Sequence, residues 1–217
     1  MGKRPALLLM ALWLAACGST AAAAPGANKT NPKGPAQMAT PEQDTAVVQH
    51  ALAQELHVPE SAVKVRPLDV KVPGITVFSA AVDPGKAGRH VSRTGIVEGG
   101  AIYTETDAMS RVARAWHYGA KRTVPAATVA QVFGTLHNAT ADSSAFTEED
   151  TVLTYKKVSG PKRSAAVAMP VEATVDGLPA VVYSLTSSAR GTPFSMVTAI
   201  VKPDFSVELR VQPVLED

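Results

Sequence analysis

The chain has 217 residues, with 21 Lys and Arg against 19 Asp and Glu, and 46% of its residues are apolar. This length suits one domain or two tightly packed halves. The small net charge of +2 gives no support for nucleic-acid binding, which calls for a strongly basic face. A single cysteine excludes a framework of internal disulfides and needs a separate explanation.

Residues 1–16 have the composition of an export signal. Lys3 and Arg4 precede an apolar run, from Ala6 to Ala16, that contains no charged residue. Its length lies within the range of about 7–15 residues for the core of a signal peptide. A membrane-spanning helix would need about 20 residues. We therefore expect residues 1–16 to be cleaved off.

The only cysteine, Cys17, directly follows this segment in the sequence Leu14-Ala15-Ala16-Cys17-Gly18. The motif resembles the lipobox of bacterial lipoproteins. This resemblance implies cleavage before Cys17, a diacylglyceryl thioether on its sulfur, an acylated α-amine and stable anchoring to an envelope membrane. In a Gram-negative organism Gly18 would favour the outer membrane. The alternative is an ordinary secretory signal that ends among alanines 21–24 and discards Cys17.

Residues 17–39 are predicted to be a lipidated, flexible tether. Small and polar residues dominate from Gly18 onward, and Met38 is the single large apolar residue, so the segment has too little apolar surface to order itself. A flexible coil of this length has an end-to-end distance of about 25 Å. Loss of Lys3 and Arg4 with the leader would leave 19 basic and 19 acidic residues, a nearly neutral mature protein.

Residues 40–217 are predicted to form an α+β globular domain, which starts with a helix. Thr40-Pro41-Glu42-Gln43 matches a capping box with proline at the first helical position, and the apolar spacing that follows predicts a helix over residues 41–57. Paired strands are expected next, and both faces of the second should be covered. The expected strands are residues 62–70, 75–82, 90–97 and 101–104.

Two more helices are predicted from apolar residues at i, i+3, i+4 and i+7. The first has Met109, Val112, Ala113 and Trp116 on its apolar side, with Gly119 expected as its C-terminal cap. The second has the apolar residues Val129, Val132, Phe133 and Leu136, and it contains Gly134, which costs about 1 kcal/mol relative to Ala.

The C-terminal third is predicted to be an acidic loop over residues 142–150 and then a β-meander. Asp176-Gly177 is a strong hairpin signal, and Lys202-Pro203-Asp204 indicates a type I turn. The last strand should alternate, with Phe205, Val207, Leu209 and Val211 inward. The whole is an α+β fold of antiparallel sheet(s) with about three packed helices, possibly as two packed halves, residues 40–140 and 150–217.

Common catalytic motifs are missing from the sequence, and an acylated Cys17 would leave no thiol. His50 and His57 are about 10 Å apart along a helix, too far to share a metal ion. We expect no catalytic residue, no metal site and no cofactor.

Arg111 and Arg114 form the most suggestive cluster of polar residues, with His117 and Tyr118 expected on the same polar side of their helix. Arginine suits carboxylate or phosphate recognition, so this helix is a candidate anion-binding site. Arg89, His90, Arg93, Lys121 and Arg122 could extend it. The favoured alternative is a solvated helix face whose cations interact with the helix dipole.

The sequence therefore favours a lipid-anchored envelope protein that acts as a non-enzymatic binding or structural module. Its partner would be another envelope protein or a cell-wall component, docked at the wet face or the edge of the last strand. Two alternatives stay open. One is an envelope hydrolase with a deep pocket that holds a histidine near a serine or an acid, and the other is a small-anion-binding lipoprotein.

Overall fold

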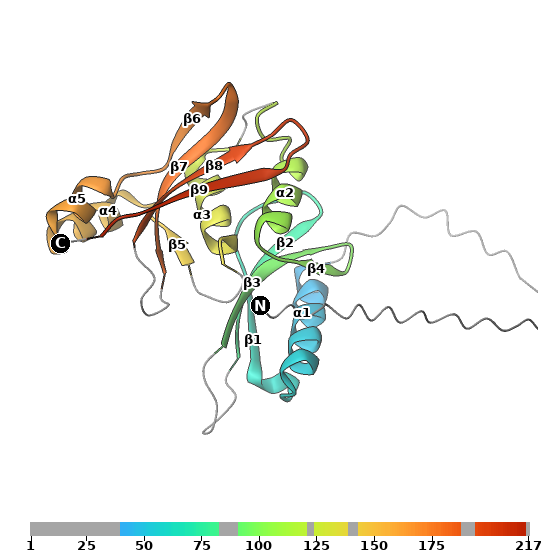
Figure 1. The fold of residues 1–217 in the computed structure, drawn as a ribbon. Coiled ribbons are helices and arrows are strands. Elements are labelled where there is room, and N and C mark those ends of the chain that lie inside the picture. The colour runs from blue at the N-terminus through green and yellow to red at the C-terminus, as the bar shows by residue number, and fades with distance from the viewer. Residues whose placement is uncertain (1–39, 83–90, 121–123, 139–142, 188–193, 216–217) are drawn as a thin grey trace, which may run out of the picture. The chain divides into compact units, whose positions relative to one another are not determined.

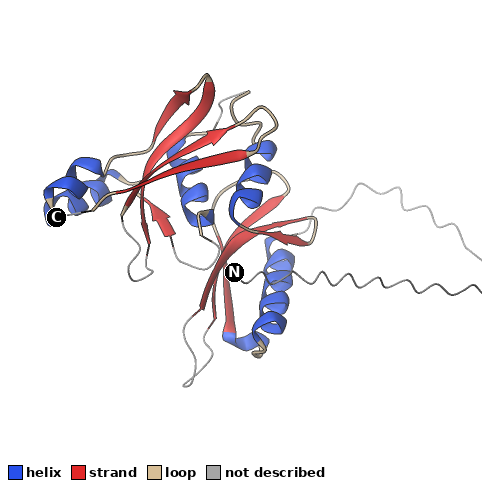
Figure 2. Cartoon of the chain, viewed as in Figure 1, coloured by secondary structure: helices blue, strands red, loops and turns tan. Residues whose placement is uncertain are grey.

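The computed structural model describes residues 40–82, 91–120, 124–138, 143–187 and 194–215. The predicted leader, the tether and Cys17 lie outside them, as do Arg89, His90, Lys121 and Arg122. In the described residues the chain forms five α-helices and two antiparallel sheets of four and five strands (Figures 1 and 2). The predicted α+β class with a C-terminal meander is confirmed.

The described helices have 6 to 16 residues. They are α1 (Pro41–Leu56), α2 (Glu105–Ala115), α3 (Ala126–Leu136), α4 (Glu149–Val158) and α5 (Pro161–Ala166), with a 3₁₀ turn η1 (Glu60–Ala62) after α1. The first sheet has the order β1 (Val63–Pro67), β2 (Ile75–Val82), β3 (Val91–Glu98), β4 (Ala101–Tyr103). The second has the order β5 (Ser143–Ala145), β7 (Leu178–Ser187), β8 (Ser195–Val201), β9 (Val207–Pro213), and β6 (Val171–Val175) also pairs with β7.

The predicted capping box starts α1. The Thr40 hydroxyl accepts from the Gln43 amide, and the Gln43 side chain accepts from the Thr40 amide at 2.9 Å. At the other end His57 adopts a left-handed conformation with φ 54°, and Val58 donates back to the Ala53 carbonyl. This is the hydrogen-bond pattern of a Schellman cap, which satisfies the last carbonyls of the helix.

β2 is covered on both faces, as predicted. Phe78 and Val82 pack with Val48 and Leu52 of α1 in one buried cluster. Val77, on the opposite face, belongs to the main core, which also contains residues of α2, α3 and the second sheet. Alternate side chains of a strand point to opposite faces, so this one strand separates two apolar clusters.

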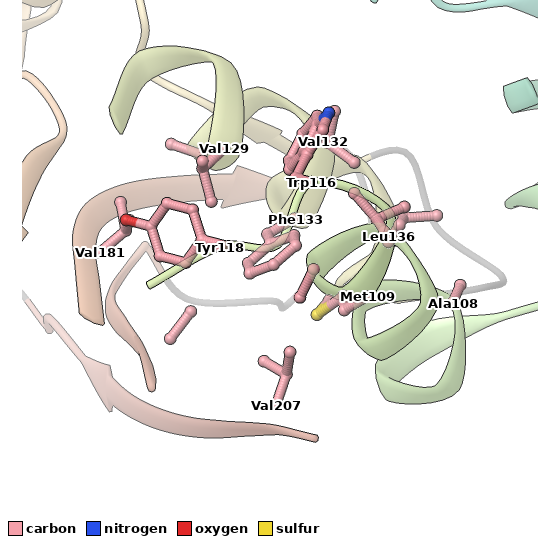
Figure 3. Close-up of a cluster of buried hydrophobic side chains, with 14 of the residues drawn as sticks. Ala108, Met109, Trp116, Tyr118, Val129, Val132, Phe133, Leu136, Val181 and Val207 are labelled. Carbon is pink, nitrogen blue, oxygen red and sulfur yellow. The ribbon is translucent and has the colours of Figure 1, made fainter. Parts of the chain in front are cut away.

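α2 and α3 contact both sheets and supply much of the main core (Figure 3). All eight apolar residues that predicted these helices are buried: Met109, Val112, Ala113, Trp116, Val129, Val132, Phe133 and Leu136. Two details of the sequence interpretation are wrong. The left-handed residue that caps α2 is His117 rather than Gly119, since Tyr118 donates to the Ala113 carbonyl. Tyr118 is itself buried in the main core rather than on the polar side.

Gly134 has a packing role that its helix propensity does not reveal. A Cβ atom at this position would lie 2.9 Å from both the Cβ and the backbone nitrogen of Ala145 in β5. Such distances are too short for carbon contacts, so glycine permits α3 to pack directly on the strand.

α4 and α5 occupy the region predicted to be a loop and the start of the meander, so the described residues form five helices rather than about three. α4 has one buried residue, Val152, and therefore lacks the apolar stripe by which helices are found in sequences. Its acidic residues lie in the first turn and Lys156 and Lys157 in the last, an arrangement that complements the helix dipole. Its Tyr155 packs against the rings of Phe146 and Phe194.

The predicted C-terminal hairpins are present. Asp176 and Gly177 both have positive φ, as a type I′ turn requires, and they connect β6 to β7. In the last strand Val207 is buried and Leu209 is partly buried, but Val211, on the same side, is 45% exposed. The inward stripe therefore ends earlier than predicted.

Candidate functional site

The turn between β8 and β9 sets the register of the last strand. The Lys202 carbonyl accepts from Phe205 at 2.8 Å, and the Lys202 amide donates to the Ser206 carbonyl at 2.9 Å. Phe205 adopts φ 66°, the left-handed position that glycine usually takes in this type of bulged turn. The bonds pair Lys202 with Ser206, and the ladder continues from Val201 opposite Val207.

This register decides which backbone groups of β9 face away from the sheet. In an antiparallel pair, alternate residues exchange hydrogen bonds with the neighbouring strand. Because Lys202 and Ser206 are hydrogen-bonded, Glu208 and Arg210 bond to β8 in turn. The N–H and C=O groups of Val207, Leu209 and Val211 therefore point outward.

The amide at each end of this outward row is unavailable to a further strand. The Val207 amide donates to the hydroxyl of Ser110 in α2 at 3.2 Å, and Pro213 has no amide hydrogen. No described residue pairs with the outward groups of Leu209 or Val211, because β9 neighbours β8 alone. We call residues 209–211 the open β9 edge.

Charged side chains on β9 form ion pairs with each other, with Lys202 and with the turn between β6 and β7. Arg210 contacts Asp176 through Nη2 and Glu208 through Nε, both at 3.1 Å, and Lys202 contacts Glu208 at 3.2 Å. The hydrogen bond from Arg210 is the main cause that lowers the pKa of Glu208, followed by the one from Lys202. Arg210 is thus held over the strand while 52% of its side chain stays exposed.

A hollow of about 220 Å³ lies at the turn end of the same sheet. Its walls include Tyr118, Pro179, Pro203 and Phe205. The ring of His117 meets Phe205 edge-on, with 6.2 Å between ring centroids. Two residues in the unfavourable left-handed conformation therefore touch beside one apolar hollow, where local strain is concentrated.

Arg111, the first predicted anion ligand, is engaged within the fold. Its guanidinium contacts the Glu98 carboxylate, lies 3.6 Å from Asp107, and stacks over Tyr103 at 3.4 Å from the ring centroid. These contacts connect α2 to the β3–β4 hairpin. Anion binding here stays a prediction, and an incoming anion would compete with two carboxylates.

Arg114, the second predicted ligand, is exposed. It lies one helical turn beyond Ser110 and therefore on the same side of α2, the side that closes the start of β9. In the described part of the chain it has no ion-pair partner. Arg93, predicted to extend the cluster, pairs instead with Glu55 at 3.1 Å.

The histidines of α1 lie at its surface. His50 contacts Glu60 at 2.7 Å and Gln54 at 2.9 Å, and His57 caps the helix through its backbone. Across the described ranges, no three or more His, Cys, Asp or Glu residues are grouped so as to hold a metal ion.

No protein-family model, curated protein or solved structure matches this chain significantly. Within the residues that the structure describes, no helix is both long and apolar enough to cross a membrane.

Proposed function

We propose that the chain is a bacterial lipoprotein, anchored through Cys17 to an envelope membrane, whose α+β domain binds another envelope component without catalysing a reaction. The anchor rests on the lone cysteine at the end of an uncharged apolar run. The binding role rests on the open β9 edge, because unpaired strand edges accept further strands through main-chain hydrogen bonds.

The anchor is tested by Cys17→Ser. We expect the unmodified protein to fractionate with membranes and to partition into detergent, and the variant to lose both properties because it cannot be acylated. Mass spectrometry of the mature N-terminus gives an independent readout. An N-terminus beyond Cys17, or unchanged fractionation of the variant, would contradict the proposal.

The binding role is tested by a photo-crosslinking amino acid placed at Val211 in intact cells. A matched probe at Val158, which is 78% exposed on α4, controls for nonspecific capture. We expect a discrete adduct of higher mass from position 211 alone. Equal labelling from both positions, or no adduct from either, would count against docking at this edge.

The hydrolase alternative has no specific support. The His50–Glu60 contact that could serve acid–base chemistry lies on the surface, with 61% and 58% of the two side chains exposed. Four hollows lined wholly by described residues have no histidine in their walls. The small-anion alternative rests on Arg111 and Arg114. Arg114 is exposed, but Arg111 has two carboxylate partners and only 27% of its side chain is exposed.

A further inference from the structure

We propose that the open β9 edge binds one extended segment of a partner protein, in which an acidic side chain stands between two apolar ones. The inference rests on the proposed function and names the class of partner. Three features of β9 support it: its free backbone groups, the side chains on its two faces, and the unavailable amides at its ends.

The backbone provides the main attraction. Leu209 and Val211 each present an outward N–H and C=O, so an antiparallel segment placed opposite them could form up to four hydrogen bonds. Before Leu209, the next outward amide belongs to Val207 and already donates to Ser110. After Val211, the next outward position is Pro213, which has no amide hydrogen. These limits fit a short core of three paired residues better than an extensive strand.

The faces of the strand determine which side chains suit the segment. Residues opposite Leu209 and Val211 lie on the core side, where the exposed surface of Val211 favours an apolar neighbour. The residue between them lies opposite Arg210. The contacts of Arg210 with Asp176 and Glu208 use Nη2 and Nε, so its Nη1 faces no described carboxylate and can donate to an acidic side chain. Exposed Arg114, near the Ser110 end, adds positive charge.

A second copy of the chain fits this edge poorly. Antiparallel pairing of two β9 strands centred on Arg210 places two arginines opposite each other, which is repulsive. Centring on Leu209 brings Val211 of the second copy to Val207, whose amide is held by Ser110. Centring on Val211 places Pro213 of the second copy, which has no amide hydrogen, opposite Leu209. A segment of a different protein therefore suits this edge better than the last strand of a second copy.

The test uses the full-length protein, purified in mild detergent, and a synthetic peptide with the sequence Gly-Ser-Thr-Val-Glu-Val-Thr-Ser-Gly, capped at both ends. A matched peptide carries Lys in place of Glu. We expect the Glu peptide to slow amide exchange at Leu209 and Val211 and to bind about tenfold more tightly than the Lys peptide, since the central charge changes sign opposite Arg210. No protection of these two amides, or equal binding of both peptides, would overturn the proposal.

Two variants locate the binding. Val211→Pro removes an outward amide that makes no bond to β8, so we expect the fold to survive and peptide binding to be lost. Val211→Thr keeps the amide and should bind like the unmodified protein. If Val211→Pro does not fold, Arg210→Glu serves instead, and it should reverse the preference in favour of the Lys peptide. Unchanged binding by Val211→Pro, or an unchanged preference in Arg210→Glu, would contradict the proposal.

The two proposals fail in different ways. Sedimentation of the protein alone should show a monomer, and a dimer that Val211→Pro dissociates would overturn the hetero-partner in favour of a second copy. If a probe at Glu208 of the same strand still captures partners in cells after Val211→Pro is added, the edge is the wrong site, while the anchored binding module stands. If no position on the domain captures any partner, both proposals are lost.

Discussion

His57 and His117 occupy left-handed positions just beyond the ends of α1 and α2, where glycine is the usual residue. Histidine reaches this conformation more readily than most residues with a side chain, but still at a cost. The sequence draws attention to their rings, which could bind a metal ion or an anion. Their backbone conformation gives each a structural role, because each is the left-handed residue of a Schellman cap.

Replacing His57 by Gly should therefore stabilise the protein. We expect the free energy of unfolding to rise by about 1 kcal/mol, because glycine adopts a positive φ without steric strain. His50→Gly, seven residues earlier inside α1, is the matched control and should destabilise by at least a similar amount. Denaturant titration measures both, and a loss of stability in His57→Gly would contradict the strain argument.

Tyr183 carries a hydroxyl that has no hydrogen-bond partner in the described structure, although the residue is only 1% exposed. Removing a buried, unsatisfied hydroxyl avoids its desolvation penalty. We expect Tyr183→Phe to raise the free energy of unfolding by about 1 kcal/mol, as measured by denaturant titration at neutral pH. A destabilised variant would reveal a partner for this hydroxyl.

The same residue predicts a dependence on alkaline pH. Burial raises the pKa of Tyr183 above its ordinary value, so above about pH 10 the phenol ionises in the unfolded chain and stays protonated in the folded one. The folded state then binds more protons than the unfolded state, and stability falls as pH rises. The fall should be shallower in Tyr183→Phe, and equal slopes would show that other groups dominate.

Among the helices, α3 shows how a residue that is unfavourable locally can be required by packing. Gly134 lowers helix propensity, yet α3 forms where its apolar spacing predicted it. The sequence contains no sign of the reason, which is the approach of β5 to the helix backbone. Contacts between segments distant along the chain have no local signature.

Gly134→Ala should destabilise the protein despite its better helix propensity. A methyl group would overlap Ala145, and overpacking costs about 1–3 kcal/mol, more than the gain of about 1 kcal/mol from propensity. Gln131→Ala, at an exposed position of the same helix, is the control and should change stability by less than about 0.5 kcal/mol. Thermal or denaturant unfolding measures both, and a stabilised Gly134→Ala would show that β5 can move away.

The same distinction explains which elements sequence reasoning found. α1, α2, α3 and the hairpins have clear caps, apolar spacing or turn residues, and all of them are confirmed. α4 has one buried side chain and was missed. In the candidate site, the last strand could be found from its alternation, and Pro213 could have marked the end of its edge. The bond from Val207 to Ser110 spans 97 positions and could not be foreseen.

The main core contains residues of both sheets. Val77 and Ile96 of the first sheet and Val181, Tyr183 and Val197 of the second belong to one buried cluster with α2 and α3. Shared burial of this kind couples the stability of the segments that contribute to it. The two segments predicted as packed halves therefore have no separate main cores.

Unfolding should consequently be a single cooperative transition. We expect Val77→Ala and Val197→Ala, one in each sheet, each to lower the free energy of unfolding by about 2 kcal/mol and to shift the same transition. Far-UV circular dichroism and Trp116 fluorescence should report coincident midpoints. Two separate transitions, each sensitive to one of the variants, would contradict a common core.

Ser110 and Pro213 also bear on what happens when many copies of this domain are crowded together. Aggregating sheets grow by adding strand to strand, and each addition needs a long row of free amides and carbonyls. The Ser110 hydroxyl occupies the amide at the start of β9, and Pro213 has no amide hydrogen at its end. The free amides of Leu209 and Val211 form too short a row for such growth. We therefore expect that concentrating the domain does not seed fibres from its last strand, and under the proposal above one short segment can still attach there.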